Sequence, residues 1–132
     1  NHQLQGAKVM AKSKMGYVDG FVLPIPRKNL AAYKKMAKLA CKIWMEHGAI
    51  DYVECIADDV KNGKVTSFPQ SVKLKKGEVV FFSWATYKSR KHRDAVMKKV
   101  FSDPRMNAYE NSEMPFDGMR MFWGGFKPFL TN

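Results

Sequence analysis

The stretch from residue 78 to residue 87, EVVFFSWATY, limits the possible folds of this chain more than any other feature. Its apolar side chains occupy both sets of alternating positions, so neither side of a strand built from it suits contact with water. Such a strand belongs in the middle of a sheet that is covered on both faces. The rest of the chain must therefore supply the layers that cover it.

Length and composition indicate one globular domain, which we place at residues 15–132. A chain of 132 residues can bury about two-thirds of its surface in a single core, and 45% of its residues are hydrophobic. No run approaches the roughly 18 apolar residues that a membrane span needs. These properties exclude the disordered, collagen-like, coiled-coil and transmembrane classes.

The first half of the chain predicts a strand, a helix and a second strand. Residues 17–25 are rich in β-branched and aromatic residues, and the prolines at the end of this run are expected to stop ladder pairing. Between residues 28 and 47, apolar side chains recur at steps of three and four, which is typical of a long amphipathic helix, and Gly48 can end it. Residues 49–57 alternate as a second strand does.

The second half predicts a loop followed by a strand, a helix and a last strand. Residues 58–77 are polar and rich in turn signals, although residues 65–72 could form a short irregular strand. Ser89 can cap a helix that follows the central strand. Residues 119–126, MRMFWGGF, are interpreted as the last strand, so the order of the elements is βαββαβ.

This order predicts an α+β fold of the ferredoxin-like kind. Two right-handed β-α-β crossovers give a four-stranded antiparallel sheet with both helices on one face. The other face is then bare, yet alternate positions such as Phe21, Phe82 and Trp84 remain apolar on both sides of the strands. Since an uncovered apolar face of that size is an expected association site, we predict a homodimer with two sheets packed face to face, a dimeric α/β barrel.

The start of the chain and its cysteines bear on processing and compartment. Residues 1–14 lack a sustained apolar period and precede Met15, which has the character of a natural start, so we interpret them as an expression leader. Cys41 and Cys55 form no CxxC motif, and no secretory signal is visible. We expect free thiols and a cytoplasmic protein.

The formal net charge of +11 raises the question of anionic partners. Many of the lysines fall where a predicted helix faces solvent, and such charge also describes many proteins that bind nothing anionic. We therefore favour solvated helix faces over nucleic-acid binding, and we expect no membrane partner.

Six strings along the chain carry a resemblance to a known family: MGYVDGFVLPIP, HGAIDYVECIADDV, NGKVTSF, VVFFSW, SDPRMN and MPFDGMRMFWGGF. Over residues 15–126 the chain resembles the YbaA-like bacterial family of unknown function (domain of unknown function 1428), which belongs to the dimeric α/β-barrel superfamily. The resemblance implies the fold and the dimer argued above. It carries over no catalytic residue, because the activity of the family is not established and its superfamily spans monooxygenases, isomerases and haem-dependent enzymes.

Two carboxylates stand out as candidate site residues. Glu54 shares its strand face with apolar neighbours, so its carboxylate should be partly desolvated and suited to act as a general acid or base. Asp19 has a similar position between Tyr17 and Phe21. The alternative for either residue is a structural ion pair, for which Arg120 on the last strand is the expected donor.

A pocket between the helices and the sheet, or at the end of the barrel, would collect these groups. His47 ends the stripe of the first helix, where capping or packing is favoured over catalysis. The expected pocket is lined by Asp19, Glu54, His47, Trp84 and Arg120.

Two classes of function remain, and neither requires a cofactor. HExxH, paired CxxC, GxSxG and GxxxxGK[ST] motifs are all missing from the sequence, so we predict no metal and no cofactor. The first class is a small-molecule enzyme or binder that acts on an apolar metabolite. The second is a non-enzymatic dimeric module for proteins or RNA, whose bases could stack on strand aromatics. An enclosed pocket with a buried carboxylate or histidine favours the first class.

Overall fold

The computed structural model describes residues 15–109 and 113–132, so the predicted leader lies outside the described residues. Its elements, in chain order, are β1 (Tyr17–Pro26), η1 (Arg27–Asn29), α2 (Leu30–Glu46), β2 (Asp51–Ile56), α3 (Phe68–Ser71), β3 (Glu78–Tyr87), α4 (Arg90–Phe101), η2 (Pro104–Tyr109), η3 (Gly118–Arg120) and β4 (Phe122–Phe126). Across the described ranges, every helix is too short or too polar to cross a membrane.

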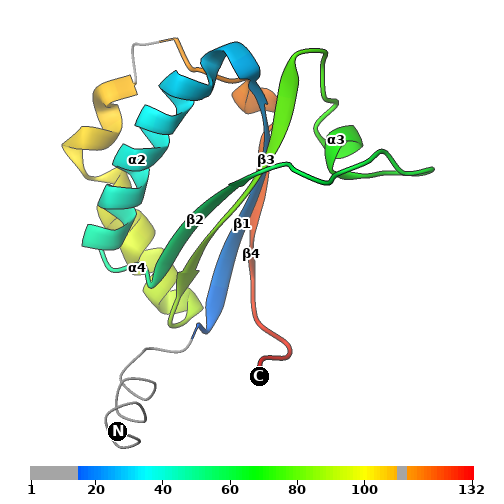
Figure 1. Ribbon diagram of the computed structural model, residues 1–132. Helices are drawn as coiled ribbons and strands as arrows, with labels where there is room; N and C mark the ends of the chain where they lie inside the picture. The colour runs from blue at the N-terminus through cyan, green and yellow to red at the C-terminus, as the bar shows by residue number, and fades with distance from the viewer. Residues whose placement is uncertain (1–14, 110–112) are drawn as a thin grey trace, which may run out of the picture.

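The four strands form one antiparallel sheet in the order β2-β3-β1-β4. Strand β3 lies between β2 and β1, where its two apolar sides predicted it, and it pairs with β1 from Tyr17 opposite Tyr87 to Pro26 opposite Glu78. The long helices α2 and α4 lie on the same side of the sheet (Figure 1). This arrangement confirms the predicted α+β class and agrees with a ferredoxin-like topology.

Strand β1 continues past the proline that was expected to end its pairing. Pro24 lies opposite Val80 of β3, and the strand reaches Pro26. Strand β4, on the other side of β1, pairs with it only as far as Val22. Because the last part of β1 has a neighbour strand on one side only, a missing N–H on the other side breaks no ladder there.

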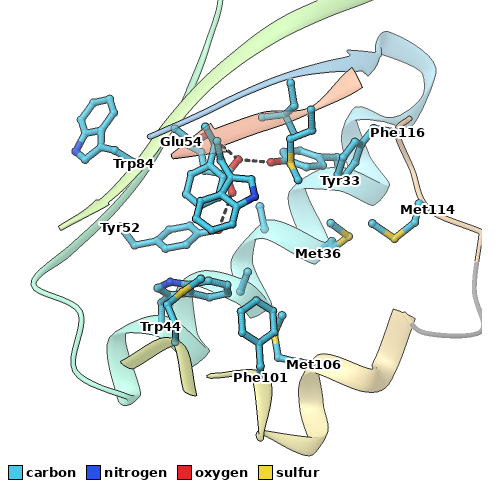
Figure 2. A pocket seen from close by; sticks show the side chains of 18 residues that line it. Tyr33, Met36, Trp44, Tyr52, Glu54, Trp84, Phe101, Met106, Met114 and Phe116 are labelled. Carbon is cyan, nitrogen blue, oxygen red and sulfur yellow. Dashed lines mark hydrogen bonds between the residues drawn. The ribbon is translucent and has the colours of Figure 1, made fainter. Parts of the chain in front are cut away.

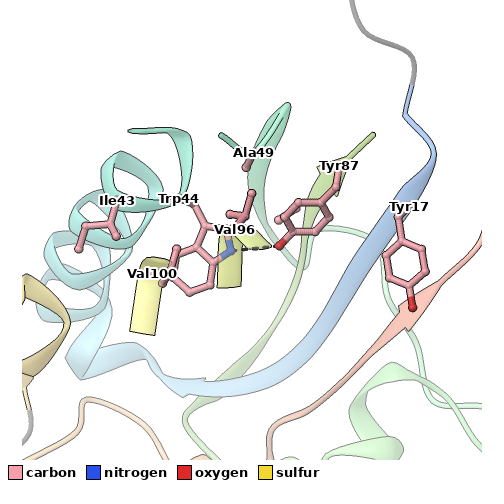
Figure 3. Close-up of a cluster of buried hydrophobic side chains, with 8 residues drawn as sticks. Tyr17, Ile43, Trp44, Ala49, Tyr87, Val96 and Val100 are labelled. Carbon is pink, nitrogen blue, oxygen red and sulfur yellow. Dashed lines mark hydrogen bonds between the residues drawn. The ribbon is translucent and has the colours of Figure 1, made fainter. Parts of the chain in front are cut away.

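The helices are joined to the sheet by a buried apolar cluster (Figure 3). Trp44 of α2 donates its indole N–H to the Tyr87 hydroxyl of β3 across 3.1 Å, so the polar edge of each ring is satisfied inside the core. Gly48 follows α2 with a φ of +113°, the left-handed conformation that favours glycine. The cluster consists of Tyr17, Ile43, Trp44, Ala49, Ala85, Tyr87, Val96 and Val100.

The connection between β2 and β3 contains a short helix instead of the irregular strand considered for residues 65–72. Ser67 accepts a hydrogen bond from the backbone N–H of Gln70 at 3.2 Å, and Pro69 occupies the first turn. A serine cap followed by proline favours a helix start, and this local signal outweighs the β-branched residues nearby. The connection then buries Val72 against one end of the sheet face that lies opposite α2 and α4.

Strand β4 is shorter than predicted, since it begins at Phe122 and not at residue 119. Asp117 accepts a hydrogen bond from the backbone N–H of Met119 and starts the η3 turn. The turn takes Met119 and Arg120, and Met121 follows it as the cap, so the strand loses the three residues with which it was predicted to begin. As a result Arg120 lies before the strand and not within it.

Among the residues that the structure describes, only one end of the sheet face opposite the long helices is covered. There Phe68, the first residue of α3, packs edge-on against Phe82 at a centroid distance of 5.6 Å. The remainder of this face, which we call the open face, carries the exposed side chains of Phe82, Phe122 and Phe126 around a hollow of about 670 Å³. The largest exposed fraction of these three side chains is that of Phe126, which is 66% exposed although it lies in a strand.

Candidate functional site

A cavity of about 390 Å³ lies between the sheet and the helical layer (Figure 2). Strand alternation explains its floor, because every second residue of each strand faces α2 and α4. Glu54 is the one charged residue in its described lining. The lining consists of Phe21, Leu23, Tyr33, Met36, Ala37, Ala40, Trp44, Tyr52, Glu54, Ser83, Trp84, Met97, Phe101, Met106, Met114, Phe116, Met121 and Trp123.

Three hydroxyl groups from three different elements hold the Glu54 carboxylate. Tyr33 of α2 and Ser83 of β3 donate to Oε1, the latter across 3.2 Å, and Tyr52 of β2 donates to Oε2 across 3.0 Å. The antiparallel register places Ser83 directly opposite Glu54. Helix α2 and two strands therefore fix both oxygens of one carboxylate inside an apolar cavity.

The two tyrosines around Glu54 remain hydrogen-bond donors over the whole physiological range of pH. Burial, together with the neighbouring Glu54 carboxylate, raises the pKa of both Tyr33 and Tyr52 far above the ordinary value of 10. A phenol with a raised pKa keeps its proton. Glu54 is thus solvated by neutral hydroxyls, and it takes part in none of the ion pairs formed by the described residues.

Arg120 pairs with neither of the carboxylates proposed for it. Its guanidinium binds both oxygens of Glu78 at 2.6 and 2.7 Å and one oxygen of Asp117 at 2.9 Å. The η3 turn explains the difference, because it places Arg120 beside the start of β3 and outside the cavity lining. The hydrogen bonds from Arg120 lower the pKa of Glu78. This ion pair has a structural role, because it joins the η3 turn to the first residue of β3.

Asp19 is fully buried, as its apolar neighbours predicted, but its donor comes from a helix. Arg93 of α4 donates from Nε to Oδ1 across 3.1 Å, while Oδ2 has no hydrogen-bond partner within residues 15–109 and 113–132. Burial raises the pKa of Asp19 and outweighs the opposing effect of Arg93. Asp19 is absent from the cavity lining, so this carboxylate joins α4 to the sheet.

Of the other two candidates, His47 makes a structural contact and Trp84 lines the cavity. His47, just after α2, places Nε2 2.8 Å from Oδ2 of Asp103 and lies outside the lining, in accord with the capping or packing role. Trp84 contributes to the lining and also to the hollow of the open face. In Figure 2 its ring lies apart from the group around Glu54. Of the five candidates, the structure thus brings only Glu54 and Trp84 to the cavity.

Comparison with known proteins identifies the family. The family model described as "Protein of unknown function (DUF1428)" matches residues 16–118. The chain belongs to the DUF1428 family. Curated proteins named "Uncharacterized protein YbaA" from Escherichia coli strain K12, from E. coli O157:H7 and from Shigella flexneri are each 48% identical to it over 116 residues, which are 88% of this chain and 98% of each relative. The resemblance drawn from the sequence strings is thereby confirmed.

Two features of the site in this DUF1428 chain escaped the sequence reasoning. The first is Tyr33, whose helical spacing placed it correctly on the buried stripe of α2 but gave no hint of a role for its hydroxyl. The second is a group of five methionines in the lining, for which the only signal was a total of nine in 132 residues. Methionine side chains are flexible and polarisable, and they suit a cavity that adapts to its content. The five are Met36, Met97, Met106, Met114 and Met121.

Proposed function

We propose that this DUF1428 protein binds an apolar small molecule in the cavity between helices and sheet, with Glu54 as its polar anchor. One observation carries the proposal. The cavity has apolar walls and a single, partly buried carboxylate, which is held by Tyr33, Tyr52 and Ser83. Small-molecule sites have this character, a mostly apolar cavity of some 300–1,000 Å³ with few, well-placed polar groups. A module that acts only through its surface has no use for such an arrangement.

Glu54 is also the lining residue suited to proton transfer. A carboxylate fixed by hydrogen bonds from three sides is already oriented before a ligand arrives, and such preorganisation favours acid–base chemistry. An enzymatic reaction in this cavity would therefore be an acid–base reaction on an apolar molecule. The cavity would supply binding by its walls and Glu54 would accept and return the proton.

A neutral fluorescent probe, such as Nile red, tests the cavity directly. Ala37 lines the cavity from α2, so Ala37→Phe fills part of the space, whereas Ala32 is exposed on the same helix and Ala32→Phe leaves the cavity unchanged. We expect the wild-type protein and Ala32→Phe to bind the probe with similar affinity, and Ala37→Phe to lose at least tenfold. Equal binding by all three proteins would place the probe elsewhere and refute the proposed site.

We propose further that the open face is covered by a second copy of this chain, in the cytoplasm. The hollow on this face is lined by apolar side chains and glycine, and its described lining holds no lysine or arginine. RNA recognition on a sheet needs positive charge next to the stacking aromatics, so the composition favours a second apolar sheet face. Two free cysteines fit the reducing compartment that we expect.

Sedimentation of charge variants tests the homodimer. Phe126→Arg puts a cation on the open face, whereas Val65→Arg changes an even more exposed apolar residue in the connection between β2 and β3. We expect wild-type protein and Val65→Arg to sediment as dimers at micromolar concentration, and Phe126→Arg to sediment as a monomer. A wild-type monomer at that concentration would refute this assembly and leave the cavity untouched.

A further inference from the structure

The hydroxyl hydrogens around Glu54 are all used in hydrogen bonds to its carboxylate. Tyr33, Tyr52 and Ser83 each carry one hydroxyl hydrogen, and all three are directed at the carboxylate. These hydroxyls keep only lone pairs for a ligand. A carboxylate has about four acceptor positions, of which the hydroxyls use three. Glu54 and the hydroxyls that hold it therefore offer acceptors to whatever enters.

The charge around Glu54 is equally one-sided. The described lining contains this carboxylate and no lysine, arginine or histidine. An anionic ligand would be repelled at short range in surroundings of low dielectric constant, whereas a neutral donor would gain an ordinary hydrogen bond. A ligand that carries a positive charge would gain a charge-assisted hydrogen bond, which is about twice as strong.

Aromatic rings flank the carboxylate on two sides. Trp44 and Tyr52 have ring centroids 5.8 Å apart, and Tyr33 and Phe116 have centroids 5.7 Å apart. Figure 2 shows Glu54 between Tyr33 and Tyr52. The face of an aromatic ring is negative and attracts cations, most strongly where water is excluded. The rings therefore favour the same ligand charge as the carboxylate does.

We propose that the ligand is a hydrophobic organic cation, an amine whose ammonium group binds Glu54 and whose apolar body fills the methionine-rich part of the cavity. This inference rests on the proposed function, since it names the class of molecule bound there. Folding has already replaced part of the hydration of this half-buried carboxylate by three hydroxyl groups, so less water has to leave it when an ammonium group binds. Glu54 is held in place beforehand, which lowers the entropy lost on binding.

The protonation of the site agrees with this assignment. Tyr33 and Tyr52 keep their protons, because burial and the nearby carboxylate raise the pKa of both phenols. Each hydroxyl therefore keeps its hydrogen directed at Glu54 and presents only lone pairs to an incoming ammonium group.

Three probes with one aromatic body separate charge from shape. They are 2-naphthylmethylamine, which is an ammonium ion at pH 7, 2-naphthylmethanol and 2-naphthoate. Each is titrated calorimetrically into wild-type protein, into Glu54→Gln and into Glu46→Gln, which removes an exposed carboxylate near the end of α2. Glutamine keeps the shape of glutamate and removes its charge.

We expect wild-type protein and Glu46→Gln to bind the amine at least tenfold more tightly than the alcohol, and the carboxylate probe least of all. In Glu54→Gln the preference for the amine should disappear while the alcohol still binds. Equal affinity for amine and alcohol in the wild type, or a preference that survives Glu54→Gln, would overturn the ligand class and leave the cavity as a binding site. Failure of all three probes to bind would overturn the proposed function together with this inference.

Discussion

Gly125 lies where α4 reaches across the edge of the sheet. A Cβ atom at this position would overlap Nη2 of Arg93 and the hydroxyl of Tyr17. Arg93 lies over the Tyr17 ring at 5.0 Å and donates to the buried Asp19 on the neighbouring strand. The missing side chain at residue 125 therefore lets one arginine reach a carboxylate that would otherwise be buried without a donor.

Gly125→Ala should destabilise the protein by about 1–3 kcal/mol, because Arg93 or Tyr17 must move to admit the methyl group. Gly118→Ala is the control, since a Cβ at residue 118 meets no atom within 4 Å. Its expected cost is below about 0.5 kcal/mol. Urea unfolding followed by circular dichroism measures both. Similar costs for the two variants would show that Arg93 and Tyr17 adjust freely.

At the scale of elements, Asp103 ties the end of α2 to the beginning of η2. Its carboxylate accepts hydrogen bonds from Nε and Nη2 of Arg105 at 3.0 and 2.7 Å, and His47 lies at 2.8 Å. Arg105 also binds Glu46 at the last turn of α2. Hydrogen bonds from Arg105 and then from His47 hold the pKa of Asp103 well below its usual value of 3.8.

Asp103→Asn should make the protein less stable at pH 7, and the difference from wild type should shrink in acid. A carboxyl with a lowered pKa in the folded state stabilises the fold above its unfolded pKa, near 3.8, and loses that effect as the pH falls through the folded value. Unfolding free energies at pH 7, 4 and 2.5 measure this change. Asp59→Asn, at an exposed loop position, is the control and should leave stability unchanged at each pH. A difference that stays constant with pH would exclude this linkage.

The elements themselves show how far local pattern predicts this fold. Strand β3 was predicted with its observed bounds, Glu78–Tyr87, because its apolar side chains occupy both sets of alternating positions and suit only a central strand. Ser89 caps α4 as expected, with its hydroxyl accepting from the N–H of His92. The differences fall where a cap residue starts a turn. Ser67 begins α3 within the connection predicted as a loop, and Asp117 begins η3 where the last strand was predicted to start.

At the scale of the whole molecule, two faces of one sheet have different surroundings. The helix-facing side encloses a cavity with a single carboxylate, and the open face exposes aromatic side chains. Apolar surface of this extent on a lone subunit favours association. In the proposed homodimer, folding and dimerisation would be coupled, because each would bury part of the same sheet.

Thermal unfolding should therefore depend on protein concentration. For a dimer of this size, a hundredfold increase in concentration is expected to raise Tm by roughly 5 °C, since only the folded state associates. Scans of the wild type from micromolar to tenths of millimolar concentration measure the shift. Phe126→Arg, with its charge on the open face, should show a Tm independent of concentration. A constant Tm in the wild type would contradict coupled folding and dimerisation.

The candidate site was partly accessible from sequence, and the reason lies in the range of the interactions. Strand alternation placed Glu54 on the side of β2 with Tyr52, and it placed Asp19 in the core. It could not decide which donors these carboxylates meet. Tyr33 reaches Glu54 from 21 positions away, and Arg93 reaches Asp19 from 74 positions away.

The sequence by itself determined the order of the elements, the central place of β3 and which residues of each strand share a face, because the periods of helix and strand convert local spacing directly into faces. Only the tertiary structure decided that Glu54 is held by hydroxyls in a cavity, and that Arg120 binds Glu78 instead. Such partnerships depend on strand register and on how a helix lies across the sheet, and no local period contains either.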